Sequence, residues 1–202
     1  MSALDRATRL EDLQWDMSFG SDGSFGSQIE VAVQALSRGI AQCVTVSPPV
    51  SWDTHTDSDN QQSQLWELLF SGLGRIMARM SELPSQAAAG ASAAASRKLL
   101  DDVVLVVLSE MGRTPQLNAD QGRDHWPWTT ALVIGPGVTG GRVVGGFDAG
   151  YAGKGLDATT AEVDERSPAP SPAALGATLL QLAGLDPTVM GPGVAPLAGV
   201  LT

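Results

Sequence analysis

Cysteine, histidine and positive charge are scarce in this sequence. Its 202 residues include one cysteine and two histidines, and 12 Lys and Arg residues stand against 22 Asp and Glu residues, for a net charge of −10. The single cysteine, Cys43, excludes a disulfide within the chain, and its place beside an apolar run predicts a small buried core residue. The shortage of basic residues excludes nucleic acid as a partner, because non-specific binding needs stripes of Lys and Arg that displace counterions.

A long apolar stretch near the N-terminus is also missing. The opening residues, MSALDRATRLEDLQWD, carry charges of both signs, so they predict neither a signal peptide nor a transmembrane span. As written, the chain would stay in the cytoplasm, and the compartment is otherwise open. Its acidic surface would also repel anionic membranes. The missing apolar stretch and the acidic surface together exclude a membrane partner and favour a small-molecule partner.

The composition that is present suits one globular domain. Hydrophobic residues make up 43% of the chain, which is enough to bury a core. The polar residues 1–26, rich in Ser and Gly, predict a flexible N-terminal segment, and residues 27–202 predict the domain. Within the domain, residues 81–98 are rich in Ala and Ser and predict a low-complexity surface connection.

Strands alternate with helices along this domain. Apolar residues recur at helical spacing in residues 27–40, 64–80 and 173–182. Short apolar runs predict strands at 40–46, 103–108 and 131–134. The run VVLVVL at 103–108 is typical of a parallel strand buried on both faces. The alternation therefore predicts an α/β fold with three layers, α/β/α, around a mostly parallel sheet.

Residues with metal-binding or anion-binding chemistry stand at the ends of the predicted strands, where ligands bind in parallel sheets. They are Asp53, His55, Glu110, Arg113, Asp124 and His125. Each histidine stands close to an aspartate in the sequence. A carboxylate oxygen together with an imidazole nitrogen suits Zn²⁺ or a similar divalent ion. The sequence therefore predicts one metal site that uses both histidines.

Each of these residues also has a plainer interpretation. Either histidine could be a hydrogen-bonded loop residue, and Glu110 could be a helix-capping partner or a solvated charge. Arg113 could clamp an anion or pair with Asp120 or Asp124. A serine triad with His125 as its base is a rival chemistry, but the chain has no G-x-S-x-G elbow.

Four blocks of the sequence, taken together and in order, resemble a known family. They are WDTH, VVLSEMGRTP, QGRDHWPWTTALVIGPGVTGGRVVG and the late GLDP. Over residues 27–190 the chain resembles the C-terminal half of domain-of-unknown-function family 1501, a bacterial family similar in fold to alkaline phosphatases and sulfatases. The resemblance implies an alkaline phosphatase-like fold that lacks its N-terminal strands, and with them the nucleophile.

The same resemblance implies roles for the candidate ligands. Asp53, His55 and His125 would hold one metal ion, with Asp124 as a further candidate ligand beside His125. The dipeptide Glu110-Met111 stands where the superfamily carries an Asp-His pair for a second ion. Glu110 is therefore the one ligand that this position offers to a second metal.

These residues predict a metal-dependent hydrolase of phosphate or sulfate esters. The cofactor would be a divalent ion, Zn²⁺ by preference and Ca²⁺ or Mn²⁺ otherwise, and the substrate a small-molecule ester. Arg113 would neutralise a non-bridging oxygen of the ester. The alternative is a truncated relative that binds a metal or a partner without turnover, and a purely structural module is a third interpretation. A sheet edge left exposed by missing strands would also favour a homo-oligomer.

Overall fold

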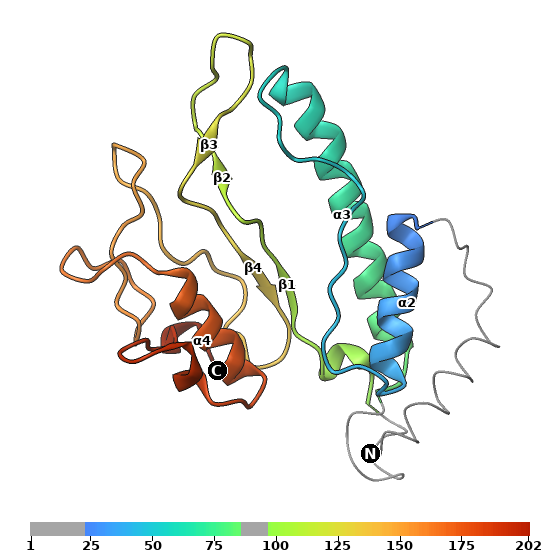
Figure 1. Ribbon diagram of the computed structural model, residues 1–202. Helices are drawn as coiled ribbons and strands as arrows, with labels where there is room; N and C mark the ends of the chain where they lie inside the picture. The colour runs from blue at the N-terminus through green and yellow to red at the C-terminus, as the bar shows by residue number, and fades with distance from the viewer. Residues whose placement is uncertain (1–22, 86–96) are drawn as a thin grey trace. The chain divides into compact units, whose positions relative to one another are not determined.

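The computed structural model describes residues 23–85 and 97–202, and the protein divides into two compact units (Figure 1). The first unit comprises the described residues up to Val103 together with Gln116–Asp124. The second comprises Val104–Pro115 and His125–Thr202. Both units therefore combine segments that are separated in the sequence.

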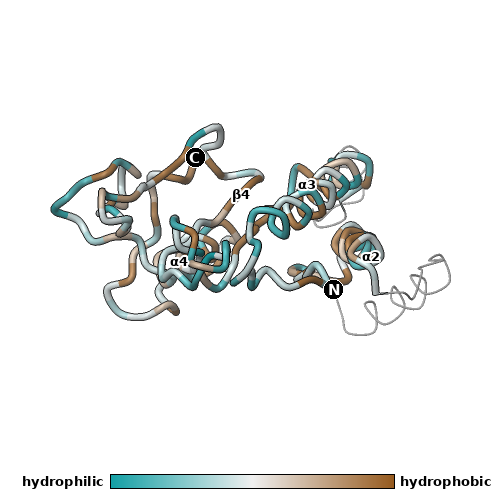
Figure 2. Tube along the Cα trace, turned by 90° about the horizontal axis from the view of Figure 1, so that it is seen from above, coloured by the Kyte–Doolittle hydropathy of each residue, from teal (hydrophilic) through white to brown (hydrophobic). Residues whose placement is uncertain are grey.

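The first unit is built on two helices, α2 (Phe25–Ser37) and α3 (Ser58–Glu82), with a short 3-10 helix, η1 (Leu99–Asp101). Its core is made of apolar side chains from all three, namely Phe25, Ile29, Val33, Met80 and Leu99. The α2 members are four residues apart, which places them on one face of the helix. α2 packs on α3, and Figure 2 shows hydrophobic residues concentrated on α2.

Both predicted helices of this unit are confirmed, and both begin earlier than predicted. α2 begins at Phe25 because the Ser27 backbone N–H donates to the Ser24 hydroxyl oxygen, 3.2 Å away, in an N-cap. α3 begins at Ser58, directly after Asp57, whose backbone lies in the left-handed region with φ at 42°. Apolar periodicity misses the first turns of α3 because their sequence, SDNQQS, is polar.

The second unit contains two small sheets and one α-helix. Its strands are β1 (Leu105–Val107), β2 (Gly112–Arg113), β3 (His125–Trp126) and β4 (Leu132–Ile134). β1 pairs antiparallel with β4, and β2 pairs antiparallel with β3. Its helices are α4 (Pro172–Leu182) and the 3-10 helices η2 (Pro187–Met190) and η3 (Ala198–Val200). α4 confirms the predicted last helix, and the Ser171 side chain caps it.

The predicted three-layer α/β/α fold with a mostly parallel sheet is wrong, and so is the alkaline phosphatase-like architecture. Among the described residues the structure has three α-helices and two two-stranded antiparallel sheets. Parallel strands need a crossover connection, usually a helix, whereas residues 108–131 form no helix. The chain instead leaves β1 through β2 and returns through β3 to β4, so both pairs are antiparallel (Figure 1).

The predicted strand at 40–46 is also wrong. These residues have no regular secondary structure, and within the part of the chain that the structure describes no strand pairs with them. Since a strand needs a neighbour to satisfy its backbone groups, apolar composition alone does not make one. Cys43 is exposed instead of buried for the same reason, because no sheet carries it into the core. The other two strands are confirmed in place as β1 and β4, with β1 half-buried.

Two predicted segments fall largely outside the described residues. Of the flexible segment 1–26, residues 1–22 lie outside them, whereas Phe25 and Gly26 already belong to α2. Of the connection 81–98, residues 86–96 lie outside them, and Pro84 and Lys98 form a β-bridge on either side. None of the described helices is long and apolar enough to span a membrane.

Candidate metal centre

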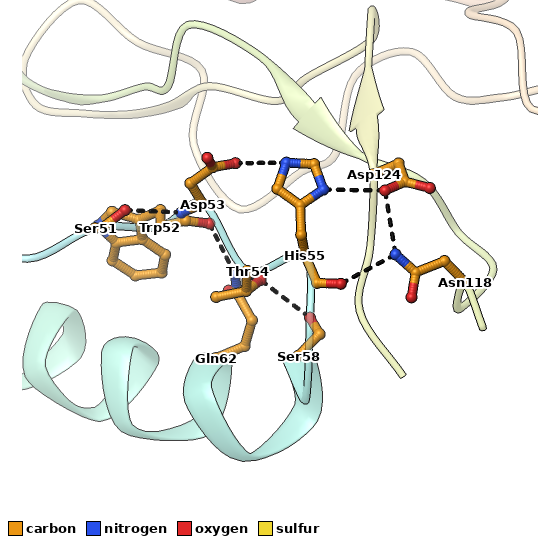
Figure 3. A network of polar contacts seen from close by, with 9 residues as sticks. All are labelled: Ser51, Trp52, Asp53, Thr54, His55, Ser58, Gln62, Asn118 and Asp124. Carbon is orange, nitrogen blue, oxygen red and sulfur yellow. Dashed lines mark hydrogen bonds and ion pairs between the residues drawn. The ribbon is translucent and has the colours of Figure 1, made fainter. Parts of the chain in front are cut away.

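Asp53 and His55 are held in place by the residue between them. Thr54 is buried, with 1% of its surface exposed, whereas the side chains of Asp53 and His55 are 53% and 44% exposed. Exposed and buried side chains thus alternate along this segment. Thr54 points towards α3 and its two neighbours point away from the helix, as Figure 3 shows. The side chains of Asp53 and His55, both candidate metal ligands, thus lie on one side of a segment that is anchored from the other.

Hydrogen bonds to α3 and to the loop Gln116–Asp124 provide this anchor. The Thr54 hydroxyl lies 3.2 Å from the Ser58 hydroxyl, and the Gln62 side-chain amide donates to Thr54 Oγ1 over 3.0 Å. The Thr54 carbonyl accepts a hydrogen bond from the Arg123 backbone N–H at 3.0 Å. Thr54 therefore joins the start of α3 to the loop that carries Asp124.

The imidazole of His55 lies between two carboxylates. Its Nε2 is 3.0 Å from Asp53 Oδ1, and its Nδ1 is 3.0 Å from Asp124 Oδ1 (Figure 3). A carboxylate only accepts hydrogen bonds, and a neutral imidazole has one donor and one acceptor. One of the two contacts therefore needs a second proton on the ring or a cation shared by the nitrogen and the carboxylate.

The distances at Asp53 suit a shared metal ion. Two ligands of a tetrahedral Zn²⁺ lie about 3.3 Å apart, given bond lengths of about 2.0 to 2.2 Å, and Nε2 and Asp53 Oδ1 are 3.0 Å apart. Asp124 occupies the other ring nitrogen, as carboxylates do beside metal-binding histidines in general. This donor set fits a divalent ion held by Asp53 and His55, with Asp124 orienting the ring.

Asn118 donates a hydrogen bond to each member of the His55–Asp124 pair. Its side-chain Nδ2 donates to the His55 carbonyl oxygen at 3.0 Å and to Asp124 Oδ1 at 3.1 Å. Its Oδ1 accepts from the backbone N–H of Asp120 at 3.0 Å and of Gly122 at 2.8 Å. The amide therefore uses both of its donor hydrogens and both acceptor positions within the first unit.

The remaining predicted residues belong to the second unit. Arg113 on β2 and His125 on β3 are register partners, which places their side chains on the same side of the two-stranded ribbon. Glu110 is exposed and accepts a hydrogen bond from the Ser109 hydroxyl at 3.1 Å. His125 follows Asp124 directly in the chain, so one peptide bond joins it to the carboxylate that contacts His55.

Sequence reasoning missed the polar residues that hold the site. Thr54, Ser58, Gln62 and Asn118 attract no attention as metal ligands, because hydroxyls and amides are common in loops and helix starts. A usable signal existed for two of them, since Ser58 and Gln62 are four residues apart and so share a face of α3. Asn118 carried no such local signal, because its partner His55 is 63 residues away.

Comparison with known proteins identifies one family. The family model described as "Protein of unknown function (DUF1501)" matches residues 4–195, which is nearly the whole chain. No curated protein and no solved structure matches the chain.

Proposed function

We propose that this chain, which belongs to the DUF1501 family of proteins of unknown function, binds a divalent metal ion that serves the hydrolysis of phosphate or sulfate esters. The observation that carries the proposal is the position of the His55 imidazole between Asp53 and Asp124, 3.0 Å from an oxygen of each. Two acceptor-only carboxylates around one imidazole need a second proton on the ring or a cation, and a metal ion at the Asp53 side would supply that cation.

The proposed ligands are Asp53 Oδ1 and His55 Nε2, with the Nδ1 proton donated to Asp124. His125 is proposed as a third ligand, because its Cα lies one peptide bond, about 3.8 Å, from that of Asp124. An imidazole nitrogen in the donor set favours Zn²⁺ over Ca²⁺ or Mn²⁺, which prefer sites made of oxygen alone. Glu110 stays a proposed ligand for a second ion.

A bound divalent ion would supply a Lewis acid for the ester oxygen and an acidified water. The chain's own contribution is to hold that position and to offset charge. With a net charge of −10 the protein repels anionic esters at long range, so a local cation is needed. Arg113 is proposed for this role, because a guanidinium binds phosphate or sulfate oxygens in pairs and it lies beside His125 on the β2–β3 ribbon.

The second candidate function is metal binding without turnover. The side chains of Asp53, His55 and Asp124 are 53%, 44% and 56% exposed, so water surrounds them. Closing an active site against bulk water strengthens its electrostatic interactions, and this site lacks that advantage. An open site of this kind favours a metal-binding role over catalysis by the described residues alone.

Metal titration of the full chain tests the proposal. Isothermal titration with Zn²⁺, Mn²⁺ and Ca²⁺ is expected to give stoichiometric Zn²⁺ binding that His55→Ala and Asp53→Asn abolish. The matched control is Asp59→Asn, which removes an exposed carboxylate from the first turn of α3 and should leave binding intact. Wild-type protein that binds no metal ion, or His55→Ala that binds it equally well, would refute metal binding.

Turnover is a separate measurement on the same proteins. Release of nitrophenol from its phosphate and sulfate esters should depend on added metal and should be lost in His55→Ala and Arg113→Met. Stoichiometric Zn²⁺ binding without turnover of either ester would instead support the non-catalytic alternative.

A further inference from the structure

Asn118 stands out among the residues around the metal centre because every hydrogen-bonding group of its side chain is directed at a specific partner. The two donated bonds go to the His55 carbonyl and to Asp124 (Figure 3). The two accepted bonds come from the backbone N–H groups of Asp120 and Gly122. Asn118 itself is half-buried. None of its bonds reaches the imidazole directly, so any influence on the ring passes through its neighbours.

The two donated bonds hold both residues of the His55–Asp124 pair. One fixes the backbone from which the imidazole projects, and the other fixes the carboxylate oxygen that contacts Nδ1. With both ends held, the ring between them has one orientation in which Nδ1 meets Asp124. In that orientation Nε2 faces Asp53.

The two accepted bonds prevent the amide from turning over. If the oxygen and nitrogen of Asn118 exchanged places, the oxygen would face two acceptors, the His55 carbonyl and Asp124. The amino group would then face two backbone N–H donors, those of Asp120 and Gly122. The hydrogen-bond pattern therefore admits a single orientation of the amide, and that orientation aims both donors at the pair.

We infer that Asn118 is a positioning residue that sets which nitrogen of His55 is offered to the metal. By holding Asp124 on Nδ1 it keeps a proton there, so that Nε2, which faces Asp53, is the nitrogen offered to a metal ion. The choice of tautomer in a metal-binding histidine is generally made by the partner of its second nitrogen. The Zn²⁺-affinity test of this inference rests on the proposed metal site. The effect of Asn118 on the His55 ring can be measured without metal.

The test compares Asn118→Asp with Asn60→Asp. Aspartate at 118 keeps an oxygen to accept from the Asp120 and Gly122 backbone, but it loses both donors. Asn60, on the first turn of α3, donates its side-chain amide to Asp57 Oδ1 at 2.7 Å. Asn60→Asp therefore removes the same type of bond and adds the same charge close by, without touching the His55–Asp124 pair.

Two measurements on these full-length proteins decide the matter. Zn²⁺ affinity should fall by about 10- to 100-fold in Asn118→Asp, as for the loss of other outer-shell partners, and should be unchanged in Asn60→Asp. In metal-free protein at pH 8, long-range ¹H–¹⁵N spectra should show Nδ1 of His55 protonated in wild type and Asn60→Asp, and only partly protonated in Asn118→Asp.

The outcomes separate the two proposals. If wild type holds the proton on Nδ1 and Asn118→Asp loses it, but no protein binds Zn²⁺, the positioning role stands and the metal site fails. If wild type binds Zn²⁺ and Asn118→Asp matches it in both affinity and tautomer, the metal site stands and the positioning role is refuted. Equal losses in Asn118→Asp and Asn60→Asp would also refute it, because charge alone would then explain the effect.

Discussion

The α-carbon of Gly122 lies directly against the backbone carbonyl of His55, and a Cβ atom at position 122 would overlap that carbonyl group. The contact belongs to a wider seam between the loop Gln116–Asp124 and the start of α3. In this seam the Arg123 N–H donates to the Thr54 carbonyl at 3.0 Å, and the Ser58 N–H donates to the Gln121 carbonyl at 2.8 Å. The seam brings Asp124 to His55, so the proposed metal centre depends on a glycine that carries no chemistry.

Gly122→Ala is expected to destabilise the first unit and to weaken metal binding together. The added methyl group forces the loop away from His55 at a cost of about 1 to 3 kcal/mol, as for other overpacked sites, and Asp124 moves with the loop. Urea unfolding and Zn²⁺ titration measure the two effects. The control is Gly74→Ala in α3, where an added Cβ meets open space and the change should stabilise the helix by about 1 kcal/mol.

Thr54→Val should cost about 1 to 3 kcal/mol of unfolding free energy and lower Zn²⁺ affinity. Valine keeps the shape of threonine but leaves the buried Ser58 hydroxyl and the Gln62 amide without the oxygen that they contact, and unsatisfied buried groups carry a penalty of this size. Thr54→Ser keeps the hydroxyl and should restore most of the affinity. Equal Zn²⁺ affinity in Thr54→Val and wild type would show that the buried anchor does not matter to the site.

The ion pair between Glu30 and Arg79 should make α2–α3 packing sensitive to acid. The Arg79 guanidinium donates to both carboxylate oxygens, at 3.1 and 2.7 Å, and this hydrogen bonding lowers the pKa of Glu30 below its ordinary value of 4.5. A lowered pKa in the folded state means that the stabilisation is complete above about 4.5 and is lost as pH falls through the folded-state pKa.

Glu30→Gln is therefore expected to be less stable than wild type by about 1 kcal/mol at neutral pH, the upper range for partly exposed pairs, and equally stable at pH 2. Urea unfolding at pH 7, 5, 4 and 2 follows the difference. Glu67→Gln, which changes an exposed acid on α3, is the control and should show no such convergence. A stability difference between Glu30→Gln and wild type that does not shrink below pH 4 would contradict the assignment.

Ile29→Ala is expected to cost about 2 to 5 kcal/mol, because truncating a buried isoleucine removes apolar contacts and leaves a cavity. Ile29 has 1% of its surface exposed and belongs to the core between α2 and α3. Val31→Ala, on the same helix with the valine 41% exposed, should stay within about 0.5 kcal/mol of wild type. Similar losses in the two variants would mean that this core does not stabilise the first unit.

Helices could be predicted from this sequence because their determinants are local. The periodic apolar residues of α2 and α4 and the serine caps at Ser24 and Ser171 lie within one or two turns of each other. Sheets could not be predicted in the same way. The run at 103–108 and the segment at 131–134 were correctly located as strands, but their antiparallel pairing depended on the path of the chain between them.

The sequence by itself determined that Asp53 and His55 would act as a pair. Two residues apart, they can face one ion where the backbone lets both project to the same side, and the burial of Thr54 between them does so here. Only the tertiary structure decided what that pair contacts. Asp124 and Asn118 reach His55 across 69 and 63 residues, through a loop whose approach requires a glycine at 122. Contacts over such separations depend on how whole segments pack, and no local pattern in the sequence encodes them.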